Sequence, residues 1–167
     1  MKKLLIITIL VFLFSRIIFS AGDRYSSWSE ILFCTKDYVL LRKVVRLVGA
    51  NQISPKNSLV LIDLSTNTVI NISEDINEVV ISSDKNLVAF TEIRKSGLWV
   101  YNISQKVKTE IATEFGYSIN FADDSQSVSY ISLKEKTLNL HIAAVDGKKN
   151  EIVYTAPVEE QAQEVQK

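Results

Sequence analysis

An internal repeat of about 40 residues limits what this chain can fold into more than any other feature does. Residues 81–90 align with residues 121–130 at an offset of 40, and residues 59–65 align with residues 98–104 at an offset of 39. Such periods are typical of arrays in which each copy buries its apolar side against the next. The sequence therefore predicts about three copies, the first only half clear, within one domain.

Each copy divides into short apolar runs separated by polar turns, a pattern that is typical of antiparallel strands. In the third copy, Asp146 and Gly147 form one of the strongest short hairpin signals. We therefore expect an all-β fold of about three four-stranded antiparallel sheets. The four strands of the second copy are expected at residues 78–82, 87–93, 98–103 and 106–111.

The N-terminus has the three parts of a secretory signal peptide. Lys2 and Lys3 precede an uncharged run over residues 4–15, and small residues end the segment at Gly22. A retained membrane anchor is the alternative, but Arg16 and the run of 12 residues argue against it, since a span needs about 20 apolar residues. We predict a signal peptide helix over residues 1–22, cleaved after residue 21 or 22, and a periplasmic or secreted protein.

Three further segments follow the signal peptide. Residues 23–56 are expected to be an extension with a short helix and an edge strand, because Ser27 and Glu30 have the spacing of a capping box. Residues 57–156 hold the repeats, and residues 157–167 form a loose, Glu/Gln-rich tail. Cys34, the sole cysteine, is expected to be a small buried side chain.

The composition argues against nucleic-acid binding and contains no catalytic motif. Without residues 1–22 the chain carries 16 basic and 19 acidic side chains, a net charge of −3, whereas nucleic-acid binding needs clustered cations. His141 is the sole histidine and lies in an expected strand, with no serine or cysteine partner that the sequence assigns to it. We predict a protein that is not an enzyme, with no catalytic, cofactor-binding or metal-binding residues and no cofactor.

Four aromatic side chains are the candidate partner-binding residues. Trp99, Tyr101, Tyr117 and Tyr130 lie in or beside expected strands, where they would form an aromatic face for a peptide or sugar. The alternative is that they fill the space between neighbouring copies. The sequence leaves both interpretations open.

Residues 83–90 and 98–103 resemble the WD40-like β-propeller repeat of TolB and of prolyl-oligopeptidase-type proteins. In that pattern a turn with Pro-Asp-Gly precedes an apolar strand that ends in Ala-Phe, as Ala89 and Phe90 do here. The turn is Ser83-Asp84-Lys85 in one copy and Asp123-Asp124-Ser125 in the next, so it keeps aspartate but loses proline and glycine. The resemblance covers residues 57–155.

The resemblance implies an extracytoplasmic array of propeller blades that recognises proteins or envelope components, and it implies no catalytic residue. Closed propellers contain about four to eight blades, so three copies leave exposed strands at both ends. Three interpretations remain open. The chain could form a homo-oligomer that completes the ring by edge-strand pairing, or it could be an incomplete propeller capped by its terminal segments. It could also be a shortened relative of a longer protein. The predicted function is a non-catalytic protein-interaction scaffold in the periplasm or cell envelope. The alternative is a glycan- or small-ligand-binding β domain that uses Trp99 and Tyr101.

Overall fold

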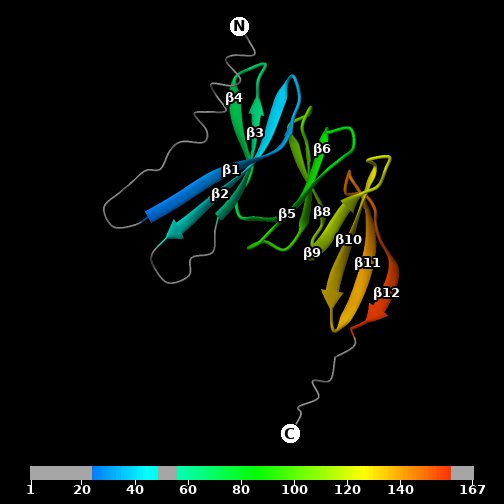
Figure 1. The fold of residues 1–167 in the computed structure, drawn as a ribbon. Coiled ribbons are helices and arrows are strands. Elements are labelled where there is room, and N and C mark those ends of the chain that lie inside the picture. The colour runs from blue at the N-terminus through cyan, green and yellow to red at the C-terminus, as the bar shows by residue number, and fades with distance from the viewer. Residues whose placement is uncertain (1–23, 49–55, 159–167) are drawn as a thin grey trace. The chain divides into compact units, whose positions relative to one another are not determined.

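The computed structural model describes residues 24–48 and 56–158, and these residues form twelve strands in three four-stranded antiparallel sheets (Figure 1). The predicted all-β class and the three sheets are confirmed. The signal peptide predicted over residues 1–22 and nearly all of the predicted tail lie outside the described residues. The strands are β1 (Arg24–Cys34), β2 (Tyr38–Val48), β3 (Lys56–Asp63), β4 (Thr68–Ser73), β5 (Ile76–Ile81), β6 (Leu87–Glu92), β7 (Leu98–Asn102), β8 (Val107–Ala112), β9 (Gly116–Phe121), β10 (Ser127–Lys134), β11 (Thr137–Ala144) and β12 (Asn150–Pro157).

The chain divides into two compact units, residues 1–77 and residues 78–167. The first unit contains the sheet with strand order β1-β2-β3-β4. The second contains the sheet β9–β12 and all but the first two residues of the sheet β5–β8. No helix long and apolar enough to cross a membrane occurs among the residues described.

The segment expected to be an extension supplies the first two strands of the first sheet instead. Ser27 and Glu30 lie in β1, so the predicted short helix is wrong. β2 is not an edge strand, because it pairs with β1 on one side and β3 on the other. An ion pair joins Glu30 to Arg42 directly across the β1–β2 ladder, so these two charged side chains support the pairing of the strands. Cys34, at the end of β1, is exposed rather than buried.

The repeat aligns the second and third sheets strand by strand, with one change of offset. The amide of Ile103 donates to the carbonyl of Asn86, and the amide of Val145 donates to the carbonyl of Gln126. The residue numbers of equivalent positions therefore differ by 40 before the central hairpin and by 42 after it, because the β10–β11 hairpin is longer than the β6–β7 hairpin. Leu98 corresponds to Leu140 in the structure, and not to Leu138 as the sequence alignment alone predicts.

The turns that replace Pro-Asp-Gly keep the backbone conformation that glycine would favour. Lys85 has φ of 59° and Ser125, its equivalent, has φ of 58°. Asp84 stabilises the first turn, since its carboxylate accepts hydrogen bonds from the Ser82 hydroxyl at 2.5 Å and the Asn86 amide at 3.0 Å. The bond from Ser82 also holds the pKa of Asp84 below its ordinary value. These turns set the register in which β6 and β10 begin.

The second unit has one apolar core between its two sheets. Leu98 and Val100 of one sheet pack in the same cluster as Val128, Tyr130 and Ala143 of the other. Strand alternation explains this, since residues two apart point to the same face. Each of these side chains is at most 3% exposed. The face of β5–β8 that takes part in this core is called the covered face below.

Candidate protein-interaction surface

The sheet β9–β12 has a second face that carries apolar side chains and is largely open to solvent. The register places Leu140 directly opposite Ile131 on one side and Tyr154 on the other, so the three share this face. Leu133 and Tyr154 are 57% and 65% exposed. We call this surface the outer face; it comprises Tyr117, Ile131, Leu133, Leu138, Leu140, Ile142 and Tyr154.

The opposite face of the same sheet carries a polar cluster in which Tyr130, Ser132 and His141 are buried and Glu114 is partly exposed. Ser132 Oγ lies 2.8 Å from His141 Nε2, and His141 Nδ1 lies 3.4 Å from Glu114 Oε1. The Tyr130 hydroxyl donates to the same Glu114 oxygen and accepts a hydrogen bond of 2.7 Å from the Asn150 side-chain amide. The cluster thus joins β10, β11, β12 and the loop before β9.

The electrostatics of this cluster keep Glu114 ionised and Tyr130 protonated. Burial by itself would raise the pKa of the Glu114 carboxyl, but the hydrogen bonds from Tyr130 and Asn150 and the nearby His141 outweigh it and lower that pKa. Burial and the bond to Glu114 raise the pKa of the Tyr130 hydroxyl far above its ordinary value. The tyrosine therefore acts as a donor to a carboxylate.

Ser132, His141 and Glu114 stand in the order of a serine–histidine–carboxylate triad. Such a triad acts only if the serine oxygen can attack a substrate carbonyl. Here Ser132 is 5% and His141 6% exposed, so the serine oxygen is shielded from a substrate carbonyl in this structure. We interpret the group as a structural network.

The network was missed at the sequence level for a specific reason. Alternation along β10 places Tyr130 and Ser132 on one face, and this signal was present in the sequence. The approach of Glu114 depends on the path of the loop between β8 and β9, which no local pattern encodes.

The four predicted aromatic residues do not form one surface. Tyr130 is fully buried in the core, and Tyr101 is 4% exposed. Trp99 and Tyr101 alternate with Leu98 and Val100 and so lie on the side of β7 away from the covered face. Only Tyr117 lies on the outer face. Tyr130 fills the space between two neighbouring copies, as the alternative interpretation states.

Trp99 belongs to a second cluster on that side of β7. The Lys108 ammonium lies 4.5 Å from the centroid of the Trp99 ring and 2.7 Å from Glu92 Oε1, whose side chain is buried. The Trp99 indole nitrogen is buried without a hydrogen-bond acceptor. This tryptophan is thus fixed by a cation–π contact and does not present an open binding platform.

No protein-family model and no curated protein matches the sequence. Among solved structures, the β-propeller domain of the Trilobed protease from Pyrococcus furiosus aligns with 78% of this chain and 43% of its own, at 15% identity and a TM-score of 0.56. The acylaminoacyl peptidase of Pyrococcus horikoshii aligns with 73% of this chain and 24% of its own, at 16% identity and a TM-score of 0.51. The sheets are β-propeller blades.

The propeller fold confirms the resemblance that the repeat turns indicated. A putative TolB from Agrobacterium tumefaciens also aligns, over 76% of this chain and 67% of its own, at 10% identity and a TM-score of 0.47. The chain spans less than half the length of the Trilobed protease propeller domain and about a quarter of the length of the acylaminoacyl peptidase.

Comparison of the second and third blades shows why the outer face is open. Leu98, Val100 and Ala112 of the second blade correspond to Leu140, Ile142 and Tyr154 of the third. The first three are 0%, 3% and 6% exposed, whereas the last three are 36%, 42% and 65% exposed. A following blade covers the first set, and no blade among the described residues covers the second.

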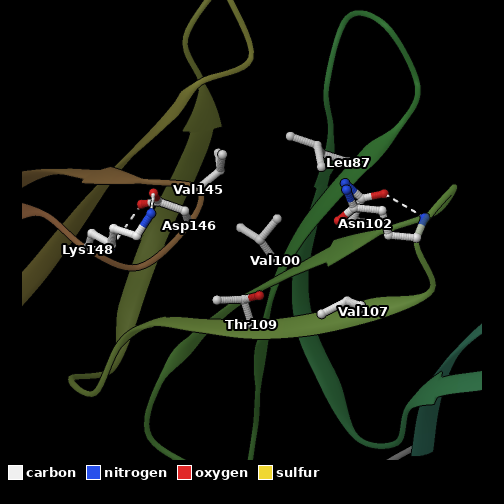
Figure 2. Close-up of a pocket in the computed structure, with 9 residues that line it drawn as sticks. Leu87, Val100, Asn102, Val107, Thr109, Val145, Asp146 and Lys148 are labelled. Carbon is white, nitrogen blue, oxygen red and sulfur yellow. Dashed lines mark hydrogen bonds and ion pairs between the residues drawn. The ribbon is translucent and has the colours of Figure 1, made fainter.

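A cavity of about 290 Å³ lies between the second and third blades (Figure 2). Leu87, Val100 and Val145 form apolar walls. The ion pair of Asp146 and Lys148, at 2.9 Å, lies at the β11–β12 turn. The cavity could hold a small apolar group. Within residues 24–48 and 56–158, no cluster of three acidic, histidine or cysteine side chains could hold a metal ion.

Proposed function

We propose that the chain is an exported, non-catalytic scaffold that binds protein in the periplasm or cell envelope through the outer face of its third blade. The observation that supports this proposal is the exposure of Leu140, Ile142 and Tyr154 at positions that are buried in the second blade. Large exposed apolar patches on folded proteins mark interaction sites.

The energetics of this surface favour a protein partner over a small ligand. Burying one exposed Leu or Ile side chain contributes about 1.5–3 kcal/mol, and the outer face offers several in a row. A flat apolar sheet face lacks the concavity and converging polar groups of a small-ligand site. The alternative of a glycan site at Trp99 and Tyr101 has less support, because Tyr101 is buried.

The non-catalytic part of the proposal is supported by the burial of Ser132 and His141. The export part is supported by the signal-like residues 1–22. Mass spectrometry of the N-terminus of the protein recovered from cells tests export directly. A mature chain that begins at Gly22 or Asp23 is expected, and an intact N-terminus in the cytoplasmic fraction would contradict export.

Site-specific photo-crosslinking tests the binding surface. A photoreactive amino acid at Leu133, on the outer face, should give a defined covalent adduct with a protein in intact cells. The same group at Val107, which is similarly exposed on β8, is the control. Equal adducts from both positions, or none from Leu133, would count against the outer face as the binding surface.

A further inference from the structure

We propose that the cavity between the second and third blades binds a small uncharged molecule with an apolar body and one carbonyl oxygen, and that Asn102 donates a hydrogen bond to that oxygen. The cavity is separate from the outer face, so this inference goes beyond the proposed function and does not depend on it. The residues that line the cavity all belong to the compact unit of residues 78–167.

One wall of the cavity is a patch of four side chains on two paired strands. Asn102 of β7 lies directly opposite Val107 of β8. Val100 and Thr109 form the neighbouring pair. Residues two apart on a strand point to the same face, so the four side chains lie together (Figure 2). Val100 is 3% exposed and Val107 is 49% exposed, so the cavity is closed near Val100 and opens to solvent near Val107.

The β11–β12 turn of the third blade forms the facing wall, with Val145 and Asp146 in the lining. This turn lies very close to β8. A Cβ on Gly147 would be 2.8 Å from the backbone oxygen of Glu110 and 3.5 Å from Thr109 Cγ2, so the absence of a side chain permits the approach. The walls are therefore fixed against each other at this end, and the cavity is present before a ligand enters.

The size and charge of the cavity define the class of ligand. Its volume is about 290 Å³. Since an apolar cavity of about 150 Å³ accepts benzene, this one accepts a molecule of about ten non-hydrogen atoms. Asp146 and Lys148, the two ionic side chains of the lining, pair at 2.9 Å, so the lining carries no net charge. An ion would lose its hydration here without gaining a partner, which favours an uncharged ligand.

The side chain of Asn102 offers a hydrogen-bond donor to such a ligand. Its Oδ1 atom accepts bonds from the Ser104 hydroxyl at 3.0 Å and from the Gln105 amide at 2.9 Å. These two bonds orient the side chain and use only its oxygen. Among the residues that the structure describes, none accepts a hydrogen bond from Asn102 Nδ2. The nitrogen therefore has its donors available for a carbonyl oxygen.

The repeat shows that the turn after β7 does not need this nitrogen. Asp63 is the equivalent residue of the first blade, because the next residue of each blade donates the equivalent backbone bond. Asp63 Oδ1 accepts from the Ser65 hydroxyl at 2.6 Å and from the Thr66 amide at 3.2 Å. The turn thus requires only an acceptor oxygen, which aspartate and asparagine both supply. Asn102 carries an additional donor at the wall of a cavity.

Three probe molecules of similar shape test the class of ligand by NMR titration of the isotope-labelled protein. Acetophenone has the apolar ring and the carbonyl oxygen, isopropylbenzene lacks the oxygen, and benzoate is an anion. Acetophenone should shift, with saturation, the backbone amide signals of Val100, Thr109 and Val145 and the side-chain amide signal of Asn102. Isopropylbenzene should bind about threefold to tenfold more weakly, since one hydrogen bond is lost, and benzoate should also bind more weakly.

Asn102→Asp tests the donor without removing the turn. The new carboxylate keeps the oxygen that Asp63 supplies in the first blade, so the fold should be retained. The affinity for acetophenone should fall about threefold to tenfold, and the affinity for isopropylbenzene should stay nearly unchanged. An unchanged affinity for acetophenone would refute the role of Asn102.

Val107→Phe tests the place of binding, because the larger side chain fills the open end of the cavity. Val153→Phe is the matched control: Val153 is also 49% exposed, lies on β12 and does not line the cavity. Binding of acetophenone and isopropylbenzene should be lost in the first variant and kept in the second. Equal binding by both variants would place the ligand elsewhere and overturn the proposal.

Three further results would overturn the proposal with the natural protein alone. They are no saturable shift at the cavity residues, equal affinities for acetophenone and isopropylbenzene, and tightest binding of benzoate. A photo-crosslink from Val107 to a protein would overturn it as well, since the cavity would then hold a protein side chain. The crosslink from Leu133 tests the scaffold function separately, so the failure of one proposal is distinguished from the failure of the other.

Discussion

Tyr130 and His141 stack face to face on neighbouring strands, with ring centroids 4.4 Å apart and planes inclined by 11°. They occupy directly opposite positions of β10 and β11. Their polar atoms reach Glu114 and Ser132, so the pair connects the apolar core to a polar network.

Removal of one hydroxyl from the network should destabilise the fold. Tyr130→Phe keeps the stacked ring but leaves Glu114 and Asn150 without their shared partner. We expect a loss of about 1–3 kcal/mol in the free energy of unfolding, measured by urea denaturation. Tyr154→Phe on the exposed edge strand is the matched control and should change it by less than about 0.5 kcal/mol. Equal effects of the two changes would contradict a role for the network.

The Glu114 carboxyl should make stability depend on acid pH. Its pKa is lowered in the folded state, so its contribution is present above the pKa of the unfolded chain. That contribution is lost as pH falls through the folded-state pKa. Urea midpoints measured from neutral to acid pH should fall less steeply for Glu114→Gln than for the natural chain. The curve of Glu151→Gln, on the exposed β12, should match the natural one; a Glu114→Gln curve that also matches would refute the assignment.

Restoring glycine in the repeat turn should stabilise the protein. Lys85 has φ of 59°, a left-handed conformation that costs a residue with a side chain about 1–2 kcal/mol and costs glycine almost nothing. After allowance for the greater backbone entropy that glycine loses, Lys85→Gly should gain about 1 kcal/mol in thermal or urea denaturation. Lys36→Gly, in the β1–β2 turn, should lower stability slightly instead. A loss of stability in Lys85→Gly would show that the lysine side chain has a role of its own.

The hairpin at Gly147 should not tolerate a side chain. Gly147 has φ of 73°, and a Cβ there would lie 2.8 Å from the backbone carbonyl oxygen of Glu110 in β8. A left-handed conformation by itself costs a residue with a side chain about 1–2 kcal/mol. Gly147→Ala should lower the free energy of unfolding by more than this, because the turn must also move away from β8. Ser96→Ala, in the exposed β6–β7 turn, should be close to neutral. Retained stability in Gly147→Ala would show that the two blades separate easily at this end.

Much of the fold was readable from local pattern. The repeat spacing, the alternation in β8 and the Asp146-Gly147 turn placed the strands of the second and third blades within a few residues of their observed bounds. The strands of the first blade were predicted less accurately. Its β1 has Ser27 and Glu30 at the spacing of a helix cap, and pairing with β2 overrode that local preference.

In the second and third blades, the sequence by itself determined which residues form strands and which sides of those strands are apolar, because alternation and turn chemistry act over a few neighbouring positions. Only the tertiary structure decided which apolar sides are covered. Leu98 and Leu140 have the same residue type at the same place in a repeat, yet one is 0% and the other 36% exposed. The difference arises because burial is a property of the neighbouring blade, and no residue within a strand encodes whether that neighbour is present.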